Sequence, residues 1–178
     1  MLSQILDDCK NQLSIAVKNK KHPFRLFTLS TQKKDRGSQM RTVVIRDFNQ
    51  ENLHFTIYTD ARSNKVEQLN LYNQAQFLFY DSTRLVQLIF ETELISIEED
   101  NYIYESLPER MKKDYTSIKP PGSRLKAPNV VKYDFSRVYF RKITFQSLSM
   151  EYLKLKRPNH LRVHFSKSDQ WKGCFLTP

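Results

Sequence analysis

The chain has 178 residues, enough for one domain with its own hydrophobic core, and its 29 Lys and Arg against 19 Asp and Glu give a net charge of +10. Hydrophobic residues make up 39% of the chain and charged residues 27%, which excludes wholesale disorder, and no apolar run is long enough to span a membrane. Only three glycines are present, which excludes a glycine-rich phosphate loop. We therefore expect a single domain over residues 1–178.

Cysteine usage and charge indicate the compartment and the class of partner. Cys9 and Cys174 have neither metal-ligand spacing nor the pattern of a disulfide framework, so we predict a reducing, cytoplasmic location and no metal site. The N-terminal residues carry acids and no early basic residue, unlike a secretory signal or a transit peptide. The positive charge attracts polyanions, which makes nucleic acid one candidate partner.

The first half of the chain predicts one helix followed by β-structure. Apolar residues at helical spacing over residues 2–18 predict an amphipathic helix, and a His-Pro pair ends it because the residue before a proline avoids the α conformation. Alternating apolar and polar residues predict three strands, at Phe24–Thr31, Met40–Phe48 and Leu53–Thr59. Asp60 is a good N-cap, so a short helix is predicted over Asp60–Tyr72.

The second half returns to strands. They are predicted at Ala75–Tyr80, Leu85–Ile97, Tyr133–Arg141, Thr144–Leu155, His160–Phe165 and Trp171–Leu176. A helical stretch over Glu98–Tyr115 is broken at Pro108, and residues 117–129 are predicted to be loop. Many strands at short spacing, with helices inserted between them, predict a mainly β fold with peripheral helices, a barrel or a sandwich.

A candidate anion site begins in the strand after Met40. Arg41 and Arg46 bracket a β-branched run, and alternation places Arg41 and Val43 on one face and Val44 and Arg46 on the other. A long cation beside backbone edges can bind a phosphate or a polar ring edge. On these residues alone, a solvated barrel strand is the alternative interpretation.

The next helix offers a second part of this candidate site. A Tyr58-Thr59-Asp60 turn leads into a helix whose first turn holds Arg62, Ser63 and Lys65. Free backbone N–H groups, a hydroxyl and two cations together suit a phosphate. The alternative is a capped surface helix with solvated cations.

These residues resemble the flavin-binding signature of the pyridoxamine 5'-phosphate oxidase-like family of FMN-binding split β-barrels. That family has an Arg, apolar residues and a Lys or Arg on a strand, then an aromatic-Thr pair, then Ser-x-Lys at a helix start. Further matches are an aromatic strand followed by a Gln, and a closing segment; these lie at Phe77–Tyr80, Gln87, Glu151–Leu153, Asn159–Arg162, Trp171 and residues 176–178. Leu107–Arg110 and Pro120–Gly122 resemble a smaller subfamily of uncharacterised flavoproteins.

The resemblance implies an FMN-binding split β-barrel that forms a homodimer with the flavin between subunits. The cofactor-binding residues that it implies are Arg41, Thr42, Val43, Val44, Tyr58, Thr59, Arg62, Ser63, Lys65, Gln87 and Arg162, the last from the partner subunit. Arg46 and His160 are the implied substrate-binding residues. The richness in aromatic residues, 12 Phe and 9 Tyr, offers a separate hint of a dimer interface.

The chain departs from the family pattern at several positions. Asn64 replaces a frequent Arg, for which Arg62 can compensate, and the family's tryptophan is matched by either Tyr152 or Leu153. The oxidases that act on pyridoxamine phosphate have an Arg where Pro158 stands here. We therefore predict an FMN-dependent oxidoreductase with an unknown small substrate and no identified catalytic residue.

Two other functions stay open at this point. One is a basic, aromatic β-barrel that binds single-stranded nucleic acid, which requires exposed aromatic side chains in Phe77–Tyr80 and Tyr133–Phe140. The other is an interaction module of the same fold without a cofactor.

Overall fold

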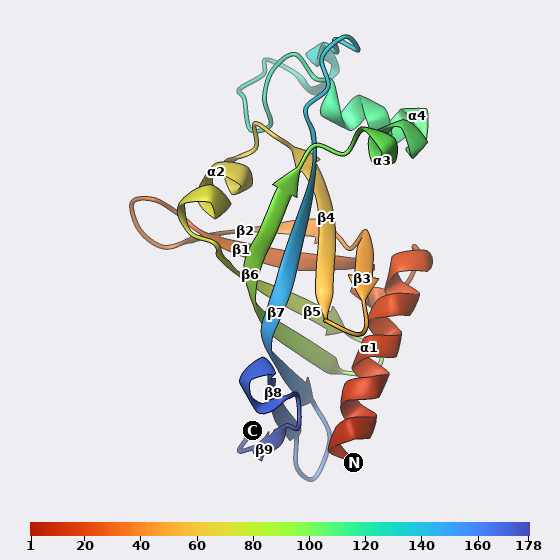
Figure 1. Cartoon of the computed structure of the whole chain (residues 1–178), viewed down its shortest axis with the longest axis vertical. Helices are drawn as coiled ribbons and strands as arrows, with labels where there is room; N and C mark the ends of the chain where they lie inside the picture. The colour runs from red at the N-terminus through yellow and green to blue at the C-terminus, as the bar shows by residue number, and fades with distance from the viewer.

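A computed structural model describes the whole chain, residues 1–178, and shows one curled antiparallel sheet with helices at its margins (Figure 1). The strands are β1 (Leu26–Gln32), β2 (Ser38–Val44), β3 (Asp47–Asn49), β4 (His54–Asp60), β5 (Gln74–Asp81), β6 (Val86–Glu98), β7 (Phe140–Lys154), β8 (Leu161–Ser166) and β9 (Cys174–Leu176). The helices are α1 (Leu2–Lys18), α2 (Asn64–Leu71), α3 (Asn101–Ser106) and α4 (Glu109–Lys112), with short 3₁₀ turns η1 (Pro23–Arg25), η2 (Lys113–Tyr115), η3 (Pro128–Val130) and η4 (Lys167–Asp169). The predicted mainly β fold with peripheral helices is confirmed.

The two longest strands, β6 and β7, give the sheet its curl. The strand order is β2-β1-β5-β6-β7-β4-β3, and β8 pairs with β7 and β9. The first half of β7 pairs with β4, and the last part of β7 pairs with β8. On its other edge, β7 pairs with β6 from Lys142 to Lys154. Register shifts after Glu91 and Leu94 bend β6, as bulges do, so the sheet closes toward a barrel.

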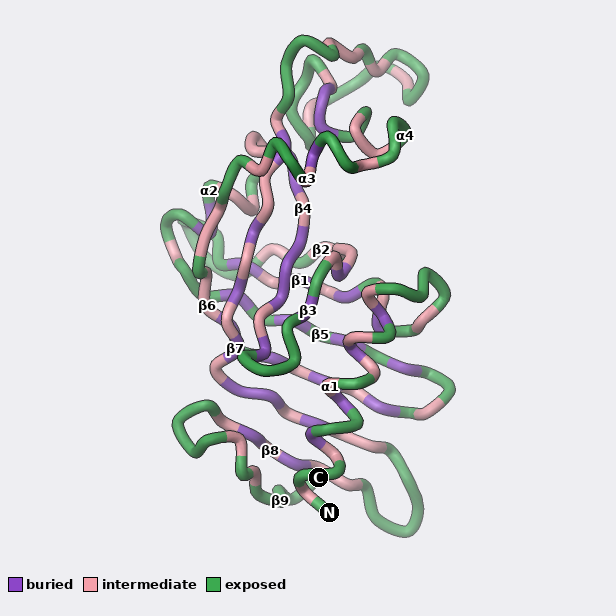
Figure 2. The backbone as a smooth tube through the Cα atoms, turned by 45° about the vertical axis from the view of Figure 1, so that its right-hand side comes forward, coloured by how far each residue is buried: buried purple, intermediate pink, exposed green.

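Phenylalanine fills the inside of this barrel. Ten of the 12 phenylalanines are buried, including Phe55, Phe77 and Phe79. Strand β5 alternates exposed and buried residues along its whole length (Figure 2). One face of α1 covers the open side of the core through Leu6, Cys9, Leu13 and Ala16. The phenylalanine content is therefore accounted for by the core and gives no separate argument for a dimer.

The structure corrects several predicted boundaries. Residues 133–139 form no strand; Tyr133 makes one isolated bridge to Ser117, because this segment bonds to the loop after η2. The strand predicted over Met40–Phe48 is broken after Val44, where the Ile45 amide donates to a carbonyl outside the sheet. The strand predicted from Trp171 begins only at Cys174.

The start of the second helix also differs from the prediction. Its N-cap is Ser63, and Asp60 is the last residue of β4. The Asp60 carboxylate accepts from the Arg62 amide and guanidinium, so this side chain organises the turn before the helix. None of the helices combines the length and apolar character that a membrane-crossing helix requires.

Gly173 is a position where the fold requires glycine. Its φ is +78°, and an added Cβ would lie 2.6 Å from the Phe165 ring. We expect Gly173→Ala to lower the free energy of unfolding by about 1–3 kcal/mol, because backbone strain and the clash add. Gly122→Ala is the matched control, since its φ is +86° but no atom lies within 4 Å. Urea unfolding of both variants measures the difference, and equal losses would contradict a role of the Phe165 contact.

Candidate anion-binding site

Four of the predicted cofactor residues come together where β2, β4 and the start of α2 meet. The Lys65 Nζ donates to Thr59 Oγ1 at 2.7 Å and to Ser63 Oγ at 3.1 Å. The two hydroxyls lie 3.1 Å apart. Arg41 is close enough to Lys65 to shift its pKa. We call Arg41, Thr59, Ser63 and Lys65 the cationic cluster.

Arg41 is held in this cluster by side chains from β1 and α2. Its guanidinium donates to Thr31 Oγ1 at 2.5 Å and to Gln68 Oε1 at 3.1 Å. Thr31 donates to the same Gln68 oxygen at 2.6 Å, and the Gln68 amide donates to Gln39. Because Thr31 and Gln68 are buried, the guanidinium is fixed before any ligand arrives.

The electrostatics of the cluster are unfavourable without an anion. Burial, and after it the nearby Arg41 charge, lowers the pKa of Lys65 from 10.5 to about 8. Burial also lowers the pKa of Arg41. Neither cation forms an ion pair with a carboxylate; their partners are neutral hydroxyl, amide and carbonyl oxygens. Two half-buried like charges beside hydroxyls and the free first amides of α2 suit a phosphate.

Arg62 lies beside the cluster but is engaged elsewhere. Its guanidinium pairs with Asp60 at 2.7 Å, donates to the Ser117 carbonyl at 2.8 Å and stacks on the Tyr139 ring at 3.4 Å from the ring centre. Hydrogen bonding to Asp60 is the main cause that raises the pKa of Arg62. This arginine therefore fixes the loop after Thr116 rather than standing free for a phosphate.

Arg46 and Tyr58 lie in a separate aromatic cluster. The Arg46 guanidinium is 5.5 Å from the centre of the Tyr58 ring, which packs edge-on against Phe140. Tyr104 and Tyr115 complete this small core. Tyr58 and Thr59 are consecutive in β4, so their side chains leave opposite faces of the strand.

Gln87 and Arg162 lie on the outer face of the sheet, away from the cationic cluster. Gln87 is opposite Leu153, and Leu153 is opposite Arg162, so the three form one row across β6, β7 and β8. Leu153 thus lies on the outer face, whereas Tyr152 is buried in the core. Arg162 pairs with Glu151 at 2.8 Å, and its Nε has no partner.

The remaining predicted residues are spread over the same strands. Thr42 alternates with Arg41 and points to the outer face with Val44, whereas Val43 packs against the core. His160 is exposed in the turn before β8, where its Nδ1 accepts from the Lys156 amide.

Residue patterns did not reveal the side chains that position Arg41. Thr31 precedes a polar turn and Gln68 follows Lys65 by one helical turn, which is compatible with ordinary surface positions. Their roles depend on contacts between β1, β2 and α2, and only the pairing of these elements shows them.

The curled sheet has the architecture of a split barrel, and the cationic cluster is its candidate anion-binding site. A family model described as the pyridoxamine 5'-phosphate oxidase FMN-binding domain matches residues 7–97, just over half of the chain. The chain belongs to this family. No curated protein matches it in sequence.

Solved structures share the fold at low sequence identity. A pyridoxamine 5'-phosphate oxidase-related, FMN-binding protein from Nostoc punctiforme is similar with a TM-score of 0.74 and 16% identity, covering 94% of this chain and 95% of that one. PhzG from Burkholderia lata, solved with tetrahydrophenazine-1-carboxylic acid, has a TM-score of 0.74 and 16% identity, covering 96% and 90%. A protein related to general stress protein 26 from Clostridium acetobutylicum has a TM-score of 0.58 and 12% identity, covering 90% and 97%. The predicted split β-barrel is thereby confirmed.

Proposed function

We propose that the protein binds FMN through the cationic cluster and acts as an FMN-dependent oxidoreductase on a small substrate. The observation that carries the proposal is the pair Arg41 and Lys65, two half-buried cations without a carboxylate partner. Arg41 donates to the neutral oxygens of Thr31 and Gln68, and Lys65 donates to those of Thr59 and Ser63. Membership of the family supports flavin as the phosphate-bearing ligand. Bound FMN would supply the hydride chemistry.

The residues of the cluster fit the phosphate end of such a ligand. A phosphate dianion accepts several charge-assisted hydrogen bonds, each worth roughly 1.5–3 kcal/mol net. Lys65 and Arg41 supply the charges, Thr59 and Ser63 supply hydroxyls, and Gln68 with Thr31 keeps the guanidinium in place. A dianion would also remove the repulsion between the two cations.

The position of Gln87 and Arg162 supports a homodimer. These two residues lie on the outer face of the sheet, whereas Arg41 lies on the inner face of β2, opposite buried Leu29. One chain therefore does not bring all predicted flavin contacts together. Exposed apolar side chains lie in the outward-facing positions of β1, β2 and β5, among them Leu26, Met40, Leu78 and Tyr80. A second copy packed on this face would bury them and could bring to the flavin its own Arg162, the residue that the family resemblance assigns to the partner subunit.

Titration calorimetry tests the cofactor directly. We expect FMN to bind with a dissociation constant in the micromolar range or below, which corresponds to about −8 kcal/mol. Riboflavin, which lacks the phosphate, should bind much more weakly. Absence of both heat and thermal stabilisation at millimolar FMN would contradict the proposal. Sedimentation of the FMN-loaded protein tests the dimer.

Pyridoxamine 5'-phosphate is expected to be a poor substrate. Pro158 occupies the position where the oxidases have an arginine, and His160 is exposed with its Nδ1 already accepting a hydrogen bond. Turnover should stay well below about 1 per second, the lower end of typical enzyme rates. An oxygen-uptake assay with FMN-loaded protein measures it, and turnover within the usual range would contradict this expectation.

The nucleic-acid alternative is weakened by burial of the aromatic side chains that it requires. Phe77, Phe79 and Phe140 are buried, although Tyr80 and Phe135 are exposed.

The other alternative is a cofactor-free interaction module of the same fold. A flavin absorbance spectrum, recorded after incubation with FMN and removal of free FMN, distinguishes an FMN-binding protein from such a module. The cytoplasmic location stays a prediction.

A further inference from the structure

We propose that the loop from Ser117 to Lys132 is a second binding site, which holds a small organic anion with an apolar body. The loop encloses a cavity of about 770 Å³, within the range of roughly 300–1,000 Å³ that small-molecule sites occupy. It lies at the end of the barrel beyond α2 (Figure 1). Its residues are separate from those of the cationic cluster, so the proposal does not depend on flavin binding.

The charge of the cavity lining selects an anion. Between Asp114 and Asp134 the chain has no acidic residue, and the cavity is lined by four cations, Lys119, Arg124, Lys126 and Lys132. None of the four forms an ion pair; Lys119 donates only to the Arg124 carbonyl. By contrast, Lys112 and Lys142 on this end of the molecule are each paired with two carboxylates. Unpaired positive charge concentrated in one cavity favours a negatively charged occupant.

The apolar part of the lining indicates more than an inorganic ion. Ile118, Leu125 and Val130 line the cavity and are exposed, and Val131 adds to them. A cavity of this size would leave an inorganic phosphate mostly in water. An organic anion would bury its apolar body against these side chains while its charged group meets the cations.

The loop is fixed to the barrel and so presents a formed cavity. The Arg62 guanidinium donates to the Ser117 and Ile118 carbonyls at 2.8 and 3.2 Å, and Asp60 holds that guanidinium from the other side. The Ile118 amide donates to the Lys132 carbonyl at 2.9 Å, which joins the two ends of the loop. Pre-formed geometry lowers the entropic cost of binding.

A polynucleotide fits this cavity less well than a small anion. Sites for single-stranded nucleic acid combine a charged track with aromatic side chains for base stacking. The cavity lining contains no aromatic residue and comes from one short loop. The observations therefore favour a compact ligand.

Equilibrium dialysis with naphthoate against FMN-saturated protein tests the proposal. We expect one saturable site per chain with a submillimolar dissociation constant, of the order of 10⁻⁴ M. Naphthalenemethanol, the neutral counterpart, should bind at least about tenfold more weakly because it lacks the charge-assisted bonds. Flavin-free protein should give the same result, so failure of FMN binding would not alter this test.

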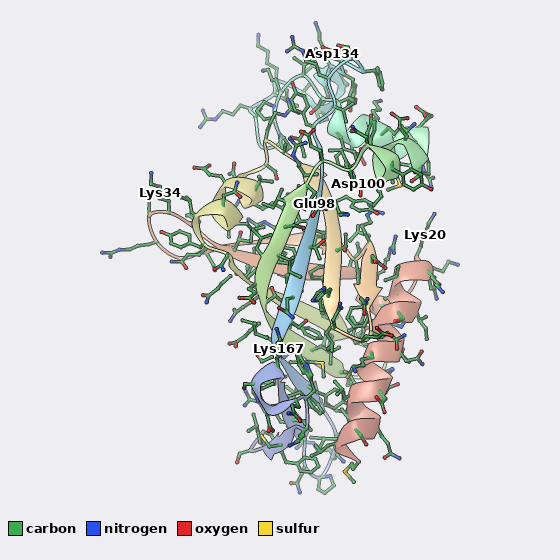
Figure 3. All side chains as sticks on the ribbon, viewed as in Figure 1. Lys20, Lys34, Glu98, Asp100, Asp134 and Lys167 are labelled. Atoms are coloured by element: carbon green, nitrogen blue, oxygen red, sulfur yellow. The ribbon has the colours of Figure 1, made fainter.

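Paired variants locate the site. Arg124→Gln with Lys126→Gln should weaken naphthoate at least about tenfold, and Leu125→Ser should weaken both probes. The matched control is Lys33→Gln with Lys34→Gln, which removes the same charge from the β1–β2 turn; Lys34 projects there, away from the loops that carry Asp134 (Figure 3). No saturable binding, equal losses in both double variants, or binding of an oligothymidylate without naphthoate would overturn the proposal.

Discussion

Lys65→Ala is expected to weaken FMN binding by about 10- to 150-fold, which corresponds to about 1.5–3 kcal/mol. The reason is that Lys65 is held by Thr59 and Ser63 without a carboxylate partner, so its charge is available to a phosphate. Arg41→Ala should have an effect of similar size. Calorimetry with FMN and with riboflavin measures both, and riboflavin should show the smaller loss on Lys65→Ala because it has no phosphate to lose.

Two control variants distinguish specific phosphate binding from non-specific attraction by the net positive charge. Lys33 and Lys34 lie in the exposed turn before β2, so Lys33→Ala and Lys34→Ala should each change the free energy of FMN binding by less than about 0.5 kcal/mol. Equal losses for FMN and riboflavin would mean that Lys65 supports the fold or the ring. Equal effects of all four cations would mean that the net charge attracts anions without a specific site.

The same lysine gives FMN binding a characteristic pH dependence. In the free protein the pKa of Lys65 is about 8, lowered mainly by burial and then by Arg41. A bound dianion would raise this pKa, so binding takes up a proton above pH 8, and the affinity should fall about tenfold per pH unit there. Riboflavin affinity should stay flat over this range, as should FMN affinity of the Lys65→Ala variant. A flat FMN profile for the unmodified protein would exclude contact between Lys65 and the phosphate.

Phe55→Ala is expected to lower the free energy of unfolding by about 3–5 kcal/mol. Phe55 is fully buried, and its ring contacts four other rings, with centres 4.8 Å from Phe48, 5.3 Å from Phe77, 5.8 Å from Phe79 and 4.9 Å from Phe90. Removing it would leave a cavity that surrounding strands of a barrel cannot fill. Urea unfolding measures the loss.

The control for this prediction is Phe135→Ala. Phe135 is 65% exposed in the segment before β7, so its removal should change stability by less than about 0.5 kcal/mol. A loss below about 1 kcal/mol for Phe55→Ala would mean that the aromatic core repacks around the site.

Local patterns predict the elements that carry their own signal. The helix over residues 2–18, the strand at Leu53–Thr59 and the break at Pro108 agree with α1, β4 and the gap between α3 and α4. The strand predicted over Tyr133–Arg141 is wrong, because an alternating apolar pattern does not show that residues 133–139 bond to the loop after η2. Such long-range hydrogen bonds override local propensity.

The sequence predicts only part of the candidate site, because the other part depends on contacts between residues far apart in the chain. Arg41, Thr59, Ser63 and Lys65 follow a family signature and lie together. The engagement of Arg62 by Asp60 and Tyr139 depends on residues far apart in the chain, as does the support of Arg41 by Gln68. Composition and spacing along the chain carry no information on such contacts.

The central position of β7 in the sheet affects the nascent chain during its synthesis. During synthesis β4 and β6 emerge long before residues 140–154, yet β7 is the partner that joins their facing edges. Until it emerges, two hydrogen-bonding edges and the phenylalanine-rich interior stay open to other chains. A nascent chain of this protein is therefore vulnerable to aggregation until its last quarter leaves the ribosome, and a fragment that ends before Phe140 should need a chaperone to stay in solution.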